Sequence, residues 1–385
     1  MAIMQGFPPE AADQATLANW RTRPYCAWAF HHVREIVPSA EIRNDPDTVW
    51  TLPRGEADLS GAGIEQAMAA SSGDAVVVLH QGRLIDEHYA NGMGPRDPHI
   101  LMSVSKSMLG LVAGALIARG ELAETDAVTK YTPELENTAF AGATIRDLLD
   151  MRVGVKFDED YFATDGPIID YRYAANWNPA PIGREPGDLR SFMSKLTERD
   201  GAHGGAFHYV SPNTDLLAWV FERASGQRYA DLFSERLLAP VGAEAPGYVT
   251  VDRIGGARAA GGVCMTPRDL ARIGMLMAKG GSREGREVIP EDWLDDIWSA
   301  GDEDAWREGD FFEKFDRRRM AYRSKWYLNK EEGVLHGLGI HGQYVFIDRE
   351  AGLSVAWVSS RHAPSEDGAF APVFDTVLKI REALA

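Results

Sequence analysis

The amino-acid sequence predicts an α/β fold in which an antiparallel β-sheet, built from both chain ends, is flanked by helices and carries a mainly helical insert. Runs of β-branched and apolar residues form hairpin patterns at residues 75–89 and 343–359, far apart in the sequence. The pattern between them is mostly helical. Strands from both ends with helices between them favour a sheet that the C-terminal segment completes. We expect residues 1–125 and 256–385 to form the α/β core domain and residues 126–255 to form the helical insert domain.

Each hairpin has a recognisable turn. Strands are predicted at 75–80 and 83–89, and the Gln-Gly dipeptide between them suits a two-residue turn because glycine readily adopts positive φ. The second pair, 343–348 and 353–359, flanks a four-residue turn that ends in Gly352. Both pairs are therefore predicted to be antiparallel.

The middle of the chain shows helical periodicity. The clearest helical segments are residues 144–151, 215–224, 229–238, 266–279 and 290–299. The segment that begins Thr266-Pro267 has a capping hydroxyl and a proline in its first turn, both typical of a helix start. Residues 158–186, rich in proline and aromatic residues, are long enough to form a lid or pocket wall.

Charge and hydropathy exclude two classes of partner. The chain has 385 residues, and its 40 basic and 57 acidic side chains give a net charge of −17, which does not suit nucleic acid. The longest uninterrupted apolar stretch, 108–118, is 11 residues, against about 20 for a membrane helix. Residues 1–23 show no secretory signal pattern. We therefore expect a cytoplasmic protein with no nucleic-acid or membrane partner.

Cysteine and histidine patterns do not indicate a metal site. Cys26 and Cys264 are too few for a disulfide framework and neither has a CxxC partner, so both are expected in the core. The histidines include no HExxH, and the adjacent pair His31-His32 has the wrong spacing for two ligands on one helix face. No metal and no cofactor are predicted.

The strongest chemical signal is Ser103-x-x-Lys106, just before the apolar run 109–118. Side chains three residues apart at a helix start share one face, so the amine can contact the hydroxyl. Burial lowers a lysine pKa, and a shift from about 10.4 to near 7 costs about 4.6 kcal/mol, which one functional site tolerates. A neutral lysine can activate serine as a nucleophile, and the N–H groups of a helix N-terminus suit an oxyanion.

A structural interpretation of the same residues stays open, with Ser103 as a helix cap and Lys106 extending to solvent. The Gly-x-Ser-x-Gly elbow of α/β-hydrolases is absent around every serine. A dispersed Ser-His-Asp triad has no local signal, and its partners cannot be found by spacing.

A second motif, Tyr209-Val-Ser211, precedes the helical run 215–224. Together with Ser103-x-x-Lys106 it resembles the penicillin-recognising serine hydrolases of the class C β-lactamase and DD-peptidase type, whose second box is Tyr-x-Asn. The resemblance implies a β-lactamase/transpeptidase-like fold in which Ser103 attacks while Lys106 and Tyr209 share the proton transfer, with Tyr209 the candidate base. Ser211 replaces the family asparagine, and its hydroxyl would make the hydrogen bond to substrate.

The third box of that family resembles the Gly-Leu-Gly sequence at 337–339, where relatives have Lys-Thr-Gly or His-Thr-Gly. In this register Ile340 supplies the backbone N–H that completes an oxyanion hole with Ser103, and Gly339 lets substrate approach the backbone. An alternative register uses 341–343. The first register lacks the basic residue, which argues against β-lactam or peptide carboxylates as substrates.

Further blocks narrow the resemblance to the 6-aminohexanoate-dimer hydrolases, which also cleave short-chain esters. They are the sequences at residues 26–30, 37–40, 101–106, 159–161 and 213–215. The resemblance implies that Tyr161 hydrogen-bonds the scissile amide and that Trp326 walls the acyl pocket. After Tyr161 the loop departs from the family pattern, so the preference for amides or esters stays open.

We therefore predict a serine hydrolase that cleaves small linear amides or short-chain carboxyl esters through an acyl-enzyme. The alternatives are a β-lactamase or DD-peptidase-like enzyme and a catalytically silent, penicillin-binding-like sensor. The acidic residues at 158–160 and Asp165 either favour a substrate with a free amine or are simply solvated. Whether the chain forms a homodimer is also open.

Overall fold

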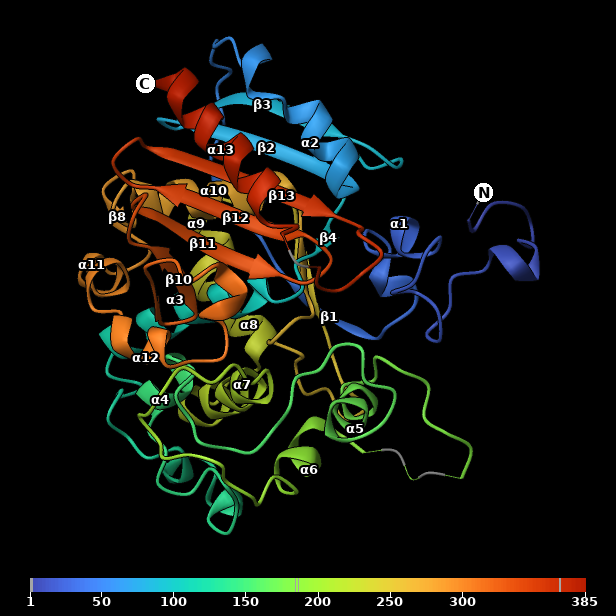
Figure 1. Ribbon diagram of the computed structural model, residues 1–385, viewed down its shortest axis with the longest axis vertical. Helices are drawn as coiled ribbons and strands as arrows, with labels where there is room; N and C mark the ends of the chain where they lie inside the picture. Colours follow the sequence, from blue (N-terminus) through green and yellow to red (C-terminus); the bar gives the residue numbers. More distant parts are fainter. Residues whose placement is uncertain (1–2, 184, 186, 367) are drawn as a thin grey trace.

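A seven-stranded antiparallel sheet forms the centre of the molecule (Figure 1). The computed structural model describes residues 3–183, 185, 187–366 and 368–385, so Pro186, the end of the predicted lid, lies outside them. The strand order is β3-β2-β13-β12-β11-β10-β9. The strands are β2 (Gly73–His80), β3 (Arg83–Tyr89), β9 (Met320–Arg323), β10 (Trp326–Asn329), β11 (Val334–Gly339), β12 (Gln343–Asp348) and β13 (Leu353–Ser359). Because β13 pairs with β2, the predicted sheet built from both chain ends is confirmed.

Helices cover both faces of this sheet (Figure 1). On one face lie α2 (Ile64–Ser71) and α13 (Ala371–Leu384), which share a hydrophobic cluster with the strands. On the other face lie α3 (Val104–Ala118) and α10 (Pro267–Ala278), in the main core. The sheet is therefore buried on both faces.

The alternation of strand side chains explains this double burial. Val76 and Val78 of β2 point into the cluster beneath α2 and α13, whereas Val77 and Leu79 point into the main core. Successive side chains of a strand face opposite sides. A strand covered on both faces is consequently apolar at nearly every position, as the Ala-Val-Val-Val-Leu run of β2 is.

A second, four-stranded sheet was not predicted. Its order is β1-β5-β6-β4, with β1 (Ser39–Ile42), β5 (Gly247–Thr250), β6 (Val263–Met265) and β4 (His99–Ile100). These strands have two to four residues, too few to show a period-two pattern. β5 lies within the predicted insert, yet it pairs with strands outside that insert. The division into two domains otherwise stays a prediction.

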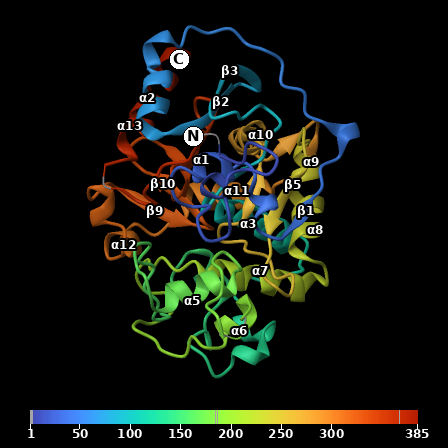
Figure 2. The same ribbon diagram turned by 90° about the vertical axis from the view of Figure 1, so that its right-hand side faces the viewer.

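The remaining helices are α1 (Cys26–Ala29), α4 (Ile145–Leu149), α5 (Pro167–Ala174), α6 (Leu189–Met193), α7 (Pro212–Ser225), α8 (Tyr229–Phe233), α9 (Ala239–Val241), α11 (Glu291–Ser299) and α12 (Glu303–Arg307). Of these, α5, α6 and α7 lie at the end of the molecule away from α2 and α13 (Figure 2). A small hairpin joins β7 (Ser282–Arg283) to β8 (Arg286–Glu287). Within the described residues, no helix combines the length and the apolar character that crossing a membrane requires.

Three sequence predictions differ from these bounds. α7 begins at Pro212 rather than at residue 215, because proline is well suited to the first turn of a helix. The helix predicted at 229–238 ends as α8 at Phe233 and continues as one π-helical turn. The loop-rich stretch 158–186 also contains a helix that the sequence did not indicate, α5, whose first residue is Pro167.

α3, which carries the predicted nucleophile segment, packs directly on the turn between β9 and β10. Ser324 and Lys325 form this turn and both have positive φ, 48° and 71°. Ser107 Oγ donates to Lys325 O at 2.8 Å. A Cβ atom on Gly110 would lie 2.0 Å from Ser324 O, so the close contact requires glycine.

Substitution of this glycine should therefore destabilise the fold. Gly110→Ala is expected to lower the free energy of unfolding by about 3 kcal/mol, at the upper end for overpacking, because the clash is with backbone rather than with a mobile side chain. The control is Gly61→Ala, where an added Cβ meets no atom within 4 Å. Urea unfolding midpoints of the two variants measure the difference. Equal stability of the two variants would contradict the close packing of α3.

Candidate active site

Ser103 stands at the N-terminus of α3, directly after a strained residue. Met102 is buried and has φ +45°, a left-handed conformation that is unfavourable for a side chain with a Cβ and is often found at functional sites. Ser103 occupies the N-cap position, but its side chain makes no capping hydrogen bond. Instead its Oγ accepts a hydrogen bond from Lys106 Nζ at 2.7 Å. The interpretation of Ser103 as a helix cap is therefore wrong.

Lys106 is enclosed by protein. The residue is 2% exposed, and Nζ donates a second hydrogen bond to Ala260 O at 2.8 Å. Burial lowers the pKa of Lys106 to about 7; Glu159 and Asp215 oppose this shift and Arg258 adds to it. The interpretation in which Lys106 extends to solvent is wrong. Near neutral pH a large fraction of the amine is unprotonated and can accept a proton.

Tyr209 lies just before α7 and completes the constellation. Lys106 Nζ lies 4.9 Å from the centroid of its ring, and the Ser103 and Tyr327 hydroxyls interact with its phenol in the direction that lowers its pKa. Burial, and then the nearby Glu159, raise the pKa of Tyr209 above that of a free phenol. Tyr209 is therefore a neutral phenol at physiological pH, a proton donor rather than a resting phenolate base.

The end of β11 lies against the Ser103 backbone. A Cβ on Gly339 would lie 3.0 Å from Ser103 N and 2.7 Å from Leu101 O, so only glycine permits this approach. Ile340 follows directly and, like Ser103, lines the cavity described below. Among the described residues, no backbone hydrogen bond is recorded from the N–H of Ser103 or Ile340. Both N–H groups are thus available to an oxyanion.

The alternative register at 341–343 is less well placed. His341 is 3% exposed and its Nδ1 hydrogen-bonds with Arg361 O at 2.8 Å. Gln343 Nε2 donates to Ser359 O at 2.6 Å. Both side chains are used within the fold, and only Gly342 of this segment lines the cavity. The geometry favours the register at 337–339.

Ser103 opens into a cavity of about 770 Å³, within the usual range of small-molecule sites. Tyr161, Tyr209, Gly339 and Ile340 also line it. Its apolar walls come from Phe157, Phe162, Phe311, Phe315, Leu338 and Phe370. Acidic groups line it at Asp158, Glu159, Asp160, Asp200, Asp310, Asp316 and Glu366, and basic groups line it at Lys156, Lys314, Arg318 and Arg361.

Two residues expected to contact substrate are placed elsewhere. Ser211 is 2% exposed, and its backbone N–H donates to Glu159 Oε2 at 2.5 Å while its Oγ donates to Glu159 Oε1. Trp326 is 1% exposed, belongs to the main core and does not line the cavity, whereas its neighbour Tyr327 does. Adjacent strand residues face opposite sides, and the sequence did not specify which of the two faces the cavity.

Glu159 is the main cavity residue whose role the sequence did not indicate. Besides the two Ser211 donors, it accepts from Tyr161 Oη at 3.0 Å. Its charge acts on Lys106, Tyr161 and Tyr209. In the sequence, Glu159 belongs to a run of acidic residues at 158–160, and such a run is usually solvent-exposed. The residue it contacts, Ser211, is 52 positions away. No local pattern could have found it.

A wall of the cavity is attached to Tyr209 by Asp310 and Phe311. Tyr209 N donates to Asp310 Oδ2 at 2.9 Å, and His208 Nδ1 hydrogen-bonds with the same oxygen at 2.8 Å. The rings of Phe311 and Tyr209 are stacked at 4.8 Å. These contacts span about a hundred positions of sequence, so spacing did not indicate them.

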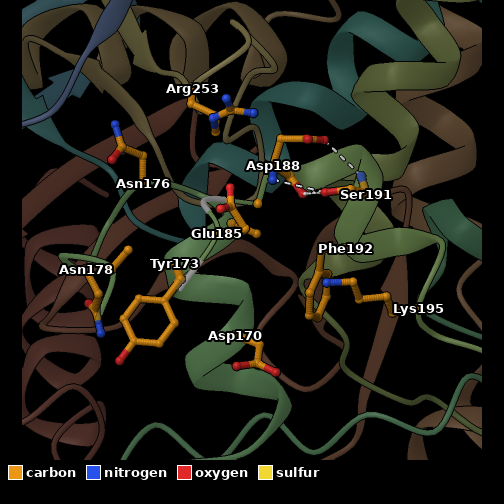
Figure 3. A pocket seen from close by; sticks show the side chains of 13 residues that line it. Asp170, Tyr173, Asn176, Asn178, Glu185, Asp188, Ser191, Phe192, Lys195 and Arg253 are labelled. Carbon is orange, nitrogen blue, oxygen red and sulfur yellow. Dashed lines mark hydrogen bonds between the residues drawn. The ribbon is translucent and has the colours of Figure 1, made fainter. Parts of the chain in front are cut away.

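A separate hollow of about 100 Å³ lies beside α5 and α6 (Figure 3). Its lining includes Ser191 and Lys195, but Ser191 Oγ donates to Asp188 O at 3.0 Å within a helix-capping box. This hydroxyl therefore has a structural role. None of the sequence-predicted site residues lines this hollow. Across the described residues, no group of three or more His, Cys, Asp or Glu side chains is arranged to hold a metal ion.

Comparisons with known proteins agree with this geometry. The Beta-lactamase family model matches residues 62–377. The chain is 34% identical over 359 residues to the 6-aminohexanoate-dimer hydrolase of Paenarthrobacter ureafaciens, covering 92% of this chain and 90% of that protein. These matches confirm the resemblance inferred from the sequence.

Solved structures confirm the predicted fold class. A Bacillus anthracis protein named as a candidate 6-aminohexanoate-dimer hydrolase has a TM-score of 0.88 at 25% identity, over 98% of this chain and 99% of that one. A family VIII carboxylesterase shares the fold, with a TM-score of 0.62 at 15% identity over 85% of this chain and 99% of that one. Because the family match covers most of the chain and a 34% identical relative aligns along nearly all of it, this protein belongs to the beta-lactamase family of hydrolases.

Proposed function

We propose that this protein is a serine hydrolase that cleaves short linear amides or short-chain carboxyl esters through an acyl-enzyme. The observation that carries the proposal is the buried Lys106 amine, 2.7 Å from Ser103 Oγ at the wall of a large cavity. A desolvated amine beside a hydroxyl is the arrangement that activates serine for acyl transfer. The similarity to a 6-aminohexanoate-dimer hydrolase supports a small linear substrate.

Acylation follows from the protonation states of the three side chains. Neutral Lys106 takes the Ser103 proton as Oγ attacks the carbonyl carbon. The carbonyl oxygen becomes an oxyanion, which the N–H groups of Ser103 and Ile340 stabilise. Tyr209 donates its proton to the leaving nitrogen or oxygen as the bond to carbon breaks, and Lys106 returns a proton to the Tyr209 oxygen. The acyl group stays on Ser103.

Deacylation reverses these transfers with water as the nucleophile. Neutral Lys106 takes the proton of the Tyr209 hydroxyl as the Tyr209 oxygen takes a proton from the attacking water. The same two N–H groups hold the second oxyanion, and Lys106 keeps the proton that the serine will need. When the bond to Ser103 Oγ breaks, the proton returns to the serine. No cofactor enters this sequence of steps.

The segment 337–339, which corresponds to the third box of the family, favours a short amide or ester substrate over a β-lactam or a peptide. A Cβ on Gly337 would lie 2.8 Å from Val345 Cγ1 and 3.1 Å from Ser107 Oγ, so this position has no room for the basic side chain of relatives. Without that charge, a substrate carboxylate loses a strong hydrogen-bond partner. The intact Ser103, Lys106 and Tyr209 argue against a silent sensor.

The nucleophile assignment is tested by Ser103→Ala. Loss of the attacking oxygen should lower turnover of a p-nitrophenyl short-chain ester at least about 10³-fold. Ser107→Ala is the matched control, since it removes a hydroxyl of the same helix that donates to Lys325 O and has no role in the reaction. Mass spectrometry should find a fluorophosphonate label on Ser103.

The substrate class is tested in the same assay. A 6-aminohexanoate dimer, a D-Ala-D-Ala peptide and the cephalosporin nitrocefin are compared with the ester. Nitrocefin turnover equal to ester turnover would favour a β-lactam-directed enzyme. Absence of both turnover and labelling would favour a sensor.

Activity should depend on pH through Lys106. Since the neutral amine is the base and the pKa of Lys106 is about 7, kcat/KM should rise about tenfold per pH unit below pH 7 and level off above it. Ester hydrolysis at constant ionic strength between pH 5 and 9 measures this profile. An inflection near pH 4, where ordinary carboxyl groups titrate, would assign the base to another residue.

Tyr161 should discriminate between amides and esters. Its hydroxyl donates to Glu159, so its oxygen is free to accept the N–H of a scissile amide, which an ester lacks. Tyr161→Phe is therefore expected to lower kcat/KM about tenfold or more for the 6-aminohexanoate dimer and little for the ester. Equal losses for both substrates would mean that the ring, rather than the hydroxyl, matters.

A further inference from the structure

The second hydrogen-bond partner of Lys106 belongs to a turn that a buried ion pair holds in place. Residues 258–262 form this turn, which leads into β6, and Lys106 Nζ donates to Ala260 O at 2.8 Å. β6 also accepts a hydrogen bond from the backbone just before Ser103, because Leu101 N donates to Val263 O at 2.8 Å. The turn therefore contacts both the backbone before Ser103 and the amine after it.

Asp215 of α7 holds the turn from the other side. Its Oδ1 accepts from Ala260 N at 2.8 Å, and its Oδ2 accepts from Arg258 Nη1 at 2.8 Å. Tyr171 Oη of α5 donates to the same Oδ2 at 2.5 Å. The Asp215 side chain is 0% exposed and that of Arg258 is 9% exposed. Each charge thus depends on the other, because an unpaired buried charge is strongly unfavourable.

The turn has little freedom to move away from these contacts. Gly262 N donates to Arg258 O at 2.7 Å, and a Cβ on Gly262 would lie 2.1 Å from Thr250 Oγ1. The Arg258 guanidinium stacks over the rings of Tyr171 and Trp177, at 4.3 and 4.9 Å from their centroids. Packing and the ion pair therefore fix the position of the Ala260 carbonyl together.

We propose that Asp215 is a positioning residue that, with Arg258, fixes the Ala260 carbonyl and thereby directs the lone pair of Lys106 toward Ser103. The proposal rests on the serine hydrolase function inferred above. The protonated amine can donate to both Ser103 Oγ and Ala260 O. The neutral amine has two N–H bonds and one lone pair, so an N–H that stays on the fixed carbonyl limits where the lone pair can point. A mobile carbonyl would let the amine rotate out of reaction geometry.

The same pair contributes to the field at Lys106. Glu159 from the loop before α5 and Asp215 from α7 favour the protonated amine, whereas Arg258 from the turn favours the neutral one. Lys325, from the turn between β9 and β10, is a further buried lysine that interacts with Lys106, and burial holds its own pKa well below the usual value. Removing only the charge of Asp215 removes one of the two groups that favour the protonated amine, which lowers the pKa of Lys106.

Two substitutions separate the charge from the hydrogen bond. Asp215→Asn keeps an oxygen that can accept from Ala260 N but removes the charge, so the acidic limb of kcat/KM should move about one unit to lower pH. Asp215→Ala removes both, and kcat on the ester should also fall at least about tenfold with KM little changed. An acidic limb that stays at the wild-type pH in Asp215→Asn would overturn the proposal.

Asp269→Asn is the matched control. Asp269 is 0% exposed, pairs with the buried Arg272 at 2.7 Å and accepts backbone N–H groups, but it lies in the first turn of α10 and is not a hydrogen-bond partner of Lys106. The Asp269→Asn variant should be less stable than the wild type, but the pH profile of its kcat/KM should not move. An equal shift in this control would show a general effect of losing a buried charge and would refute the proposal.

Tyr171→Phe keeps the proposal testable if the Asp215 variants do not fold. It removes one donor to Asp215 but keeps both charges and the ring that packs on Arg258. In Tyr171→Phe, kcat should fall several-fold while the acidic limb of the kcat/KM pH profile stays at the wild-type pH. An unchanged kcat would contradict the positioning role of Asp215. Failure of the underlying function is recognised separately, since Ser103→Ala would then retain wild-type turnover.

Discussion

The desolvated amine of Lys106 beside the Ser103 hydroxyl is the interaction on which the other features of the site depend. Its two recorded hydrogen-bond partners, Ser103 Oγ and Ala260 O, are both uncharged. A buried ammonium with neutral partners is penalised, and the amine responds by releasing its proton near neutral pH. Arg258 and Asp215, by contrast, are buried as a pair and compensate each other. The fold thus leaves the Lys106 amine without a hydrogen-bonded counter-ion at the position where a base is useful.

The parts of this site that the sequence predicted are local ones. Ser103 and Lys106 lie one helical turn apart, so helix geometry alone brings them together once α3 forms. The hairpin of β2 and β3 was equally predictable, because a Gln-Gly turn joins two short runs of strand-forming residues. Tyr209 and the glycines of β11 needed the family resemblance, since no local pattern distinguishes them from core aromatics or strand bends.

The parts that could not be predicted depend on contacts across the chain. Ser211 was expected to contact substrate, but its hydroxyl and its backbone N–H both donate to the carboxylate of Glu159, 52 positions away. Trp326 and Tyr327 are neighbours on β10, and only the register of that strand decides which of them reaches the cavity. In the small sheet of β1, β4, β5 and β6, the paired strands β1 and β5 are more than two hundred positions apart in the sequence. None of the four strands is long enough to show a recognisable strand pattern.

The reacting groups come from separate elements, which explains why backbone fit matters as much as side-chain identity. Ser103 and Lys106 come from α3, Tyr209 precedes α7, and Ile340 follows β11. Gly339 sets the distance between β11 and α3, because any Cβ there would meet Ser103 N and Leu101 O. The two N–H groups proposed to hold the oxyanion therefore keep their separation through close packing rather than through a hydrogen bond between them. An oxyanion site built this way is preorganised, so substrate binding need not reorder it before the reaction begins.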